Sequence, residues 1–253
     1  MQNSNYTLGL VSVSFRKYLV KDIIKAVKEA GLSCIEWGSD VHAPCLDKER
    51  LLEISKLQNE YGIKCCSYGT YFRLGETPIE QLEDYISAAK ILGTDILRLW
   101  CGTKSGADMS DVEKEELFKE CKKASEIAKK LGVTLCMECH KNTFTEYPSD
   151  AKLLVNAVNS SSFLTYWQPS QWQNYENNVE SAKIYAPFTK HIHVFNWEGT
   201  KKFSLELAID KWRGYLNNFS VPRTLLLEFM PNGTLEELIT EVKALKSIIG
   251  EEV

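Results

Sequence analysis

The sequence lacks the features of several protein classes. No run of about 18 consecutive apolar residues occurs, so we expect no membrane-spanning helix and no membrane partner. The segment from Met1 to Thr7 is polar and does not follow the basic-then-apolar pattern of a secretory signal peptide. These features predict a cytoplasmic protein.

Histidine and net positive charge are also scarce. The 253 residues include 4 histidines, and 30 Lys and Arg against 34 Asp and Glu give a formal net charge of −4. A nucleic-acid binder needs clustered basic residues to neutralise phosphates. A cluster of several zinc ions needs many histidine ligands. We therefore expect no nucleic-acid partner and disfavour a cluster of several zinc ions.

The eight cysteines do not form a recognisable framework. They are scattered through predicted strands and helices, which is typical of reduced thiols. Cys136 and Cys139 form a C-x-x-C string, but no second pair supports a four-cysteine zinc module. No G-x-G-x-x-G follows the first predicted strand, which disfavours an open dinucleotide-binding sheet.

What the sequence does contain is an apolar run followed by a charged, helix-periodic stretch, eight times in succession. The predicted strands cover residues 8–13, 34–37, 64–68, 96–100, 133–138, 164–168, 191–195 and 225–228. The predicted helices cover residues 20–30, 47–61, 78–92, 110–131, 148–158, 176–185, 205–217 and 235–249. Eight alternating units with right-handed crossovers predict a single α/β domain over residues 1–253, a (β/α)8 TIM barrel.

In such a barrel the active site lies at the carboxyl ends of the strands. Residues two apart in a strand share a face, and this alternation directs polar side chains from the last four strands toward the barrel axis. These side chains belong to Glu138, Gln168, His193 and Glu228. Two carboxylates, an amide oxygen and an imidazole suit Mn²⁺, Mg²⁺, Co²⁺ or Zn²⁺. A buried ion pair or a hydrogen-bonded core histidine is the alternative for any one of them.

Other polar and aromatic residues fall near the same end. Glu36 and Arg98 are expected to face each other inside the barrel, as a salt bridge or as substrate contacts. His42 is a contact to a substrate hydroxyl or a loop-stabilising residue, and His140 is a ligand or an acid–base group. Four aromatic side chains are expected either to form the apolar walls of a sugar site or to pack in the hydrophobic core. They are Tyr71, Trp100, Trp172 and Trp197.

Several short motifs end successive strands in a fixed order. They include Ile35-Glu36-Trp37-Gly38, Met137-Glu138-Cys139-His140, Tyr166-Trp167-Gln168-Pro169, His191-Ile192-His193-Val194 and Leu227-Glu228. In this order they resemble the xylose isomerase-like superfamily, which contains endonuclease IV, hydroxypyruvate isomerase, inosose dehydratase and the ketose 3-epimerases. The resemblance runs over nearly the whole chain.

The resemblance implies a divalent metal held by Glu138, Gln168, His193 and Glu228. It also implies that Glu138 and Glu228 act as general base and acid in proton transfer next to a carbonyl, through an enediolate. Gln168 departs from the family, which more often has Asp there. The ketose epimerases also place an arginine shortly after the strand-seven histidine, and residues 195–199 contain none.

Together these features predict a metal-dependent isomerase or epimerase. The expected substrate is an unphosphorylated sugar, sugar acid or polyol, because the capping box at Thr234–Glu237 places carboxylates where a phosphate would bind. A dehydratase of the inosose dehydratase kind would use the same metal site. A sugar-binding barrel that has lost its metal is the non-catalytic alternative. Homo-oligomers are common among similar proteins.

Overall fold

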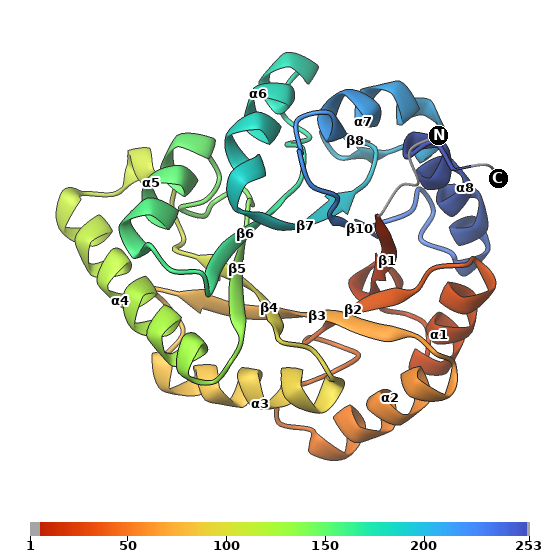
Figure 1. Cartoon of the computed structure of the whole chain (residues 1–253), viewed down its shortest axis with the longest axis horizontal. Helices are drawn as coiled ribbons and strands as arrows, with labels where there is room; N and C mark the ends of the chain where they lie inside the picture. The colour runs from red at the N-terminus through yellow and green to blue at the C-terminus, as the bar shows by residue number, and fades with distance from the viewer. Residues whose placement is uncertain (1–5, 252–253) are drawn as a thin grey trace.

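The structure, a computed structural model that describes residues 6–251, is a closed eight-stranded barrel surrounded by eight α-helices (Figure 1). The barrel strands pair in parallel in the order β1-β10-β7-β6-β5-β4-β3-β2. The predicted single (β/α)8 TIM barrel is confirmed. Within residues 6–251, no helix is long and apolar enough to cross a membrane.

The eight units follow one another along the chain. The barrel strands are β1 (Thr7–Val11), β2 (Cys34–Gly38), β3 (Lys64–Leu74), β4 (Ile96–Cys101), β5 (Thr134–Glu138), β6 (Phe163–Trp167), β7 (Thr189–Val194) and β10 (Thr224–Leu227). The helices are α1 (Val20–Glu29), α2 (Lys48–Glu60), α3 (Leu82–Leu92), α4 (Asp111–Lys130), α5 (Pro148–Val158), α6 (Tyr175–Tyr185), α7 (Ile209–Leu216) and α8 (Leu238–Ile248).

Element ends differ from the prediction where short 3-10 turns replace strand or helix. The first strand was predicted to reach Val13, but residues Ser12–Phe15 form a 3-10 turn instead. The turns Leu205–Ala208 and Leu235–Glu237 precede α7 and α8. The capping box predicted at Thr234 and Glu237 is present.

Alternation along the strands divides their side chains between two cores. Cys136, Tyr166 and Leu226 belong to a small cluster inside the barrel. Met137 and Ile192 each lie one residue away from an inward-facing position of their strand, and they pack in the large core under the helices. The expected inward faces of β5, β6 and β10 are therefore confirmed, and the same alternation brings the next inward residues to the barrel mouth.

Helix ends return the chain to each following strand. Helix α4 begins at a capping box formed by Ser110 and Glu113. Helix α3 ends at Gly93, whose φ of 85° is a left-handed conformation that residues with a Cβ resist. All eight cysteines are free thiols, as their spacing indicated.

A two-stranded hairpin that the sequence did not reveal lies beyond the carboxyl end of β7. It consists of β8 (Trp197–Glu198) and β9 (Lys201–Lys202), which pair antiparallel. The backbone N–H of Gly199, in its turn, donates to the carbonyl of Gln171 at 2.9 Å. The hairpin is thus tied to the β6–α6 loop, and the two segments shape the space above the barrel.

Candidate active site

Four side chains from consecutive barrel strands converge at the carboxyl end. Glu138 ends β5, His193 lies on β7, and Gln168 and Glu228 directly follow β6 and β10. The Nδ1 atom of His193 lies 3.0 Å from Gln168 Oε1, 3.5 Å from Glu138 Oε1 and 3.5 Å from Glu228 Oε2. One imidazole nitrogen therefore faces three oxygens. We call these four residues the carboxylate–histidine cluster.

The spacing of these atoms fits a metal ion. The ligand atoms of Glu138, His193 and Glu228 all lie within 4.8 Å of one another. Two ligands bound to one ion at about 2.1 Å lie about 3.0 Å apart at a right angle and about 3.4 Å apart at a tetrahedral angle. The distances from His193 Nδ1 match this range, and nitrogen and oxygen ligands suit first-row divalent ions. The buried cluster can therefore hold such an ion.

Gln168 is fixed with its oxygen toward the cluster. Its side-chain Nε2 donates to the carbonyl oxygen of Cys139 at 3.2 Å. The amide oxygen is consequently directed to His193. An amide oxygen can ligate a divalent ion without adding charge, so the departure from Asp at this position leaves a usable ligand.

Arg98 links the carboxylate of Glu138, in the cluster, to that of Glu36, which lies outside it. Its Nε donates to Glu36 Oε1 at 2.8 Å, and its Nη1 donates to Glu138 Oε2. Ser67 Oγ also donates to Glu36, at 2.7 Å. Glu36, Glu138 and Glu228 carry three negative charges and Arg98 one positive charge. The net charge is therefore −2 when His193 is neutral, which one divalent cation would balance.

The site tunes the protonation of its own groups. Burial opposes charge on Glu36, but Arg98 and His193 lower its pKa to about 2. The same two residues hold the pKa of Glu138 well below its usual range, against the cost of burial. For Glu228, burial and the neighbouring Glu138 raise the pKa, although His193 opposes them. Despite burial, the carboxylates raise the pKa of His193 to about 10. With a pKa of about 10, His193 would carry a proton at neutral pH when no cation is bound.

The residue after Glu228 has an unusual backbone. Phe229 has a φ of 56°, a left-handed conformation that is rare for a bulky side chain. Its N–H donates to Ser14 Oγ at 2.8 Å, and its ring packs against Trp197 with centroids 5.2 Å apart. This conformation fixes where the chain leaves β10 and therefore where Glu228 lies.

The cluster opens into a cavity of about 610 Å³ at the carboxyl end of the barrel, which we call the mouth cavity. Glu138, Gln168 and Glu228 line it, and His193 is fully buried. Most residues expected to contact substrate also line it, namely Tyr71, Arg98, Trp100, His140, Trp172 and Trp197. The mouth cavity is thus the space in which a ligand would meet the cluster.

Two of the expected contact residues lie elsewhere. Glu36 is fully buried and does not line the mouth cavity. His42 is also buried, with Nδ1 3.2 Å from Ser12 Oγ and Nε2 3.3 Å from the carbonyl of Tyr18. The structure therefore places Glu36 in the internal salt bridge and His42 in loop hydrogen bonds.

His140 is placed at the rim of the mouth cavity. Its ring stacks on Trp100 with centroids 5.0 Å apart. Its Nδ1 lies 2.8 Å from the carbonyl of Lys141, so this nitrogen carries the hydrogen of the neutral ring. The Nε2 atom is then available for a hydrogen bond to a ligand.

Two cationic residues of the mouth cavity were not singled out in the sequence. Arg16 donates to Asp40 and to the hydroxyl of Tyr71, both at 2.5 Å. Lys141 lies with Nζ 5.1 Å from the ring centre of Trp172. Arg16 follows β1 and Lys141 follows β5, so a search of every strand-to-helix loop for basic residues would have found both.

Comparisons with known proteins extend this description. A family model described as a xylose isomerase-like TIM barrel matches residues 24–214. The chain is 27% identical over 207 residues to a 3-dehydroshikimate dehydratase of Bacillus anthracis, a match that covers 74% of this chain and 71% of the relative.

Solved structures show the same fold. The probable 3-DHS dehydratase AsbF of Bacillus anthracis, involved in petrobactin synthesis, has a TM-score of 0.80 at 18% identity, over 95% of this chain and 98% of its own. D-psicose 3-epimerase with D-tagatose, from Clostridium cellulolyticum H10, has a TM-score of 0.70 at 11% identity, over 96% of this chain and 98% of its own. At these identities the similarity shows a shared fold.

Proposed function

This chain belongs to the xylose isomerase-like TIM-barrel family, and we propose that it is a divalent-metal-dependent lyase that removes water from a small hydroxylated carbonyl compound. The observation that carries the proposal is the approach of His193 Nδ1 to the oxygens of Glu138, Gln168 and Glu228. The similarity to 3-dehydroshikimate dehydratase supports dehydration as the reaction class.

The four residues of the carboxylate–histidine cluster would hold the ion. When bound, a divalent ion supplies Lewis acidity toward a carbonyl oxygen of the substrate. Arg98 keeps Glu138 ionised and in place, and the Nε1 of Trp100 donates to the same carboxylate at 2.6 Å. Glu138 therefore serves as a fixed anionic ligand.

Glu228 is the proposed base. It lines the mouth cavity, and no hydrogen-bond donor among residues 6–251 contacts its carboxylate other than the imidazole of His193. Burial and the neighbouring Glu138 raise the pKa of the Glu228 carboxyl, and a raised pKa makes the carboxylate a stronger base. Glu228 takes the proton from the carbon next to the carbonyl, and the electron pair delocalises onto the carbonyl as an enolate.

His140 is the proposed acid. As the enolate electrons return, the bond between carbon and the hydroxyl oxygen on the next carbon breaks. The imidazolium of His140 donates its proton to that oxygen, and water leaves. The position of His140 at the rim, stacked on Trp100, suits contact with an outward-facing hydroxyl.

Epimerisation is the second candidate, because two carboxylates reach the cluster from β5 and β10. A proton removed by one carboxylate could return from the other to the opposite face. The lowered pKa of Glu138 opposes this reaction, since its carboxylate holds a proton poorly. Dehydration needs only one of the two carboxylates as a base, and we favour it for that reason.

The experiment uses protein stripped of metal with a chelator and reloaded with Mn²⁺. The substrates are 3-dehydroshikimate, followed by ultraviolet absorbance, and D-psicose and D-fructose, followed by deuterium uptake in D₂O. We expect manganese-dependent dehydration that Glu228→Gln abolishes and His140→Asn slows. Turnover that is equal with and without metal would contradict the proposal. Deuterium uptake into a ketose without loss of water would favour epimerisation.

A further inference from the structure

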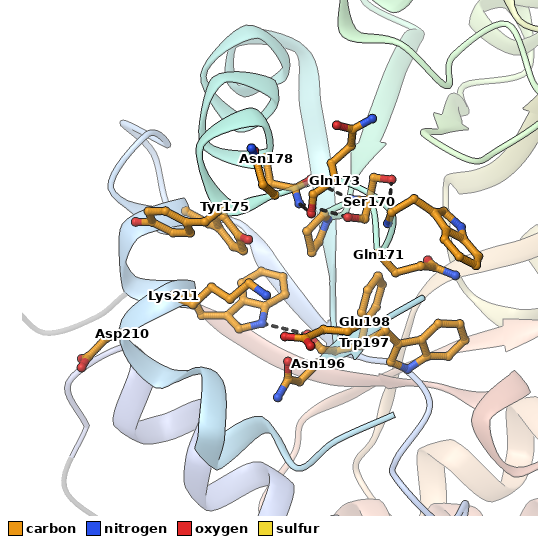
Figure 2. A pocket seen from close by; sticks show the side chains of 16 residues that line it. Ser170, Gln171, Gln173, Tyr175, Asn178, Asn196, Trp197, Glu198, Asp210 and Lys211 are labelled. Atoms are coloured by element: carbon orange, nitrogen blue, oxygen red, sulfur yellow. Dashed lines mark hydrogen bonds between the residues drawn. The ribbon is translucent and has the colours of Figure 1, made fainter. Parts of the chain in front are cut away.

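A second cavity, with a volume of about 710 Å³, lies beside the mouth cavity (Figure 2). It is enclosed by the β6–α6 loop, the segment that leads into the β8–β9 hairpin, and the start of α7. None of the four residues of the carboxylate–histidine cluster lines it. We call it the flanking cavity, and its lining residues differ in chemical character from those of the mouth cavity.

Aromatic rings provide its flat surfaces. Trp172 is 56% exposed and Tyr175 is 39% exposed, although both are large apolar side chains. Trp197 and Trp212 line the same cavity, and Trp212 is buried with its Nε1 donating to the carbonyl of Phe195. Exposed aromatic faces in a concave site suit a ligand that packs a flat C–H surface on them.

Polar groups without partners lie among these rings. No side chain among residues 6–251 forms an ion pair with Glu198 or Lys211, and the amide of Gln171 has no hydrogen bond within that range. Figure 2 shows Glu198 and Lys211 directed toward each other from β8 and α7. Hydroxyl groups of a ligand could bridge this gap, because each accepts and donates hydrogen bonds.

The charged residues of the flanking cavity do not favour an anionic ligand. Glu198 and Asp210 are acidic and Lys211 is the basic residue of its lining. Asp210 is already paired with Arg213 at 3.0 Å. One basic and two acidic residues do not favour a phosphate or a carboxylate. An uncharged, polyhydroxylated ring fits both the aromatic surfaces and this charge.

The two cavities share a wall. Trp172, Trp197 and Gln171 are among the residues that line both of them. Trp197 also packs on Phe229, next to Glu228. A ligand whose first ring lies at the cluster can therefore place a second ring in the flanking cavity by passing over this wall.

From this arrangement we propose that the flanking cavity binds a second, uncharged sugar ring, so that the substrate is a glycoside rather than a monosaccharide. This inference rests on the proposed function for the ring that occupies the mouth cavity. Binding in the flanking cavity needs no metal, and it can be tested on its own.

The test is saturation-transfer NMR with chelator-treated protein and four probes, which are cellobiose, maltose, lactose and sucrose, with D-glucose for comparison. We expect at least one disaccharide to bind with a Kd of about 1 mM, more tightly than glucose. Tyr175→Ala and Lys211→Met alter the flanking cavity alone. Each should weaken binding by about threefold to tenfold, as the loss of one stacking or polar contact predicts.

Matched controls separate the possible results. Phe203→Ala and Lys243→Met change an exposed aromatic ring and an exposed lysine outside both cavities, and binding should persist in each. Disaccharides that bind no better than glucose, or that bind equally to Tyr175→Ala and Lys211→Met, would overturn the inference. Failure of the metal-dependent reaction with intact disaccharide binding would overturn the proposed function alone.

Discussion

Gln168 and His193 face each other with the amide oxygen 3.0 Å from the imidazole Nδ1. The amide nitrogen of Gln168 is meanwhile engaged by the carbonyl of Cys139. The amide thus presents an oxygen to the cluster without adding a fourth negative charge to those of Glu36, Glu138 and Glu228. The residual charge of −2, with Arg98 counted, matches a divalent ion.

Gln168→Leu should weaken metal binding while leaving the fold intact. It removes one ligand oxygen and conserves most of the side-chain volume, so we expect affinity for Mn²⁺ to fall about tenfold to a hundredfold. Competition with a fluorescent chelator measures this change. Gln173→Leu, in the same loop, is the matched control and should bind as the wild type does. Equal affinities for the wild type and Gln168→Leu would remove Gln168 from the ligand set.

Arg98→Met should destabilise the protein strongly. The change leaves Glu36 and Glu138 buried without their cation, and breaking such a pair costs about 3–5 kcal/mol in the free energy of unfolding. Urea denaturation measures this loss. Arg50→Met breaks an exposed pair with Glu53 and should cost less than about 1 kcal/mol. Adding Glu36→Gln to Arg98→Met should restore part of the lost stability. If Arg98→Met alone loses no more unfolding free energy than Arg50→Met, this account is contradicted.

Metal binding should become tighter as pH rises. In the metal-free cluster the pKa of His193 is raised to about 10, so its imidazole is protonated at neutral pH. A ligand nitrogen must be neutral, and binding therefore displaces a proton. Affinity should increase about tenfold per pH unit between pH 6 and 8. Calorimetry in buffers of different ionisation enthalpy counts the protons released, and a count of zero would contradict this prediction.

The sequence located most of the architecture and much of the site. Repeated strand–helix units predicted the barrel, and two-residue alternation placed Glu138, His193 and Glu228 on one mouth. These predictions succeeded because parallel strands in a closed barrel share a direction and a periodicity. The position of a residue in its strand therefore determines whether its side chain points into or out of the barrel, and at which end of the barrel it lies.

Other features depend on contacts between distant segments. The link from Arg98 to both Glu36 and Glu138 depends on side-chain conformations across three strands. The β8–β9 hairpin is two residues long in each strand, too short to leave an alternating pattern. The orientation of Gln168 and the positive φ of Phe229 likewise follow from tertiary contacts.

Mild acid should destabilise the fold through His191. Burial lowers the pKa of this imidazole from 6.5 to about 4. Above pH 6.5 the histidine is neutral in both the folded and the unfolded chain, and its contribution to stability is complete. Between pH 6.5 and about 4 the unfolded chain takes up the proton first, and up to about 3 kcal/mol is lost. His191→Asn should flatten the slope of unfolding free energy against pH in this window, and an unchanged slope would contradict the assignment.

The central claim is that the carboxylate–histidine cluster binds a divalent metal, and metal content tests it most directly. Protein purified without chelator would be analysed by mass spectrometry, with Glu228→Gln in parallel and with uptake of added Mn²⁺ and Zn²⁺ as a second reading. The account predicts near-stoichiometric metal in the wild type and a large loss in the variant. Metal-free wild type that takes up neither ion, or a variant that retains the full content, would contradict it.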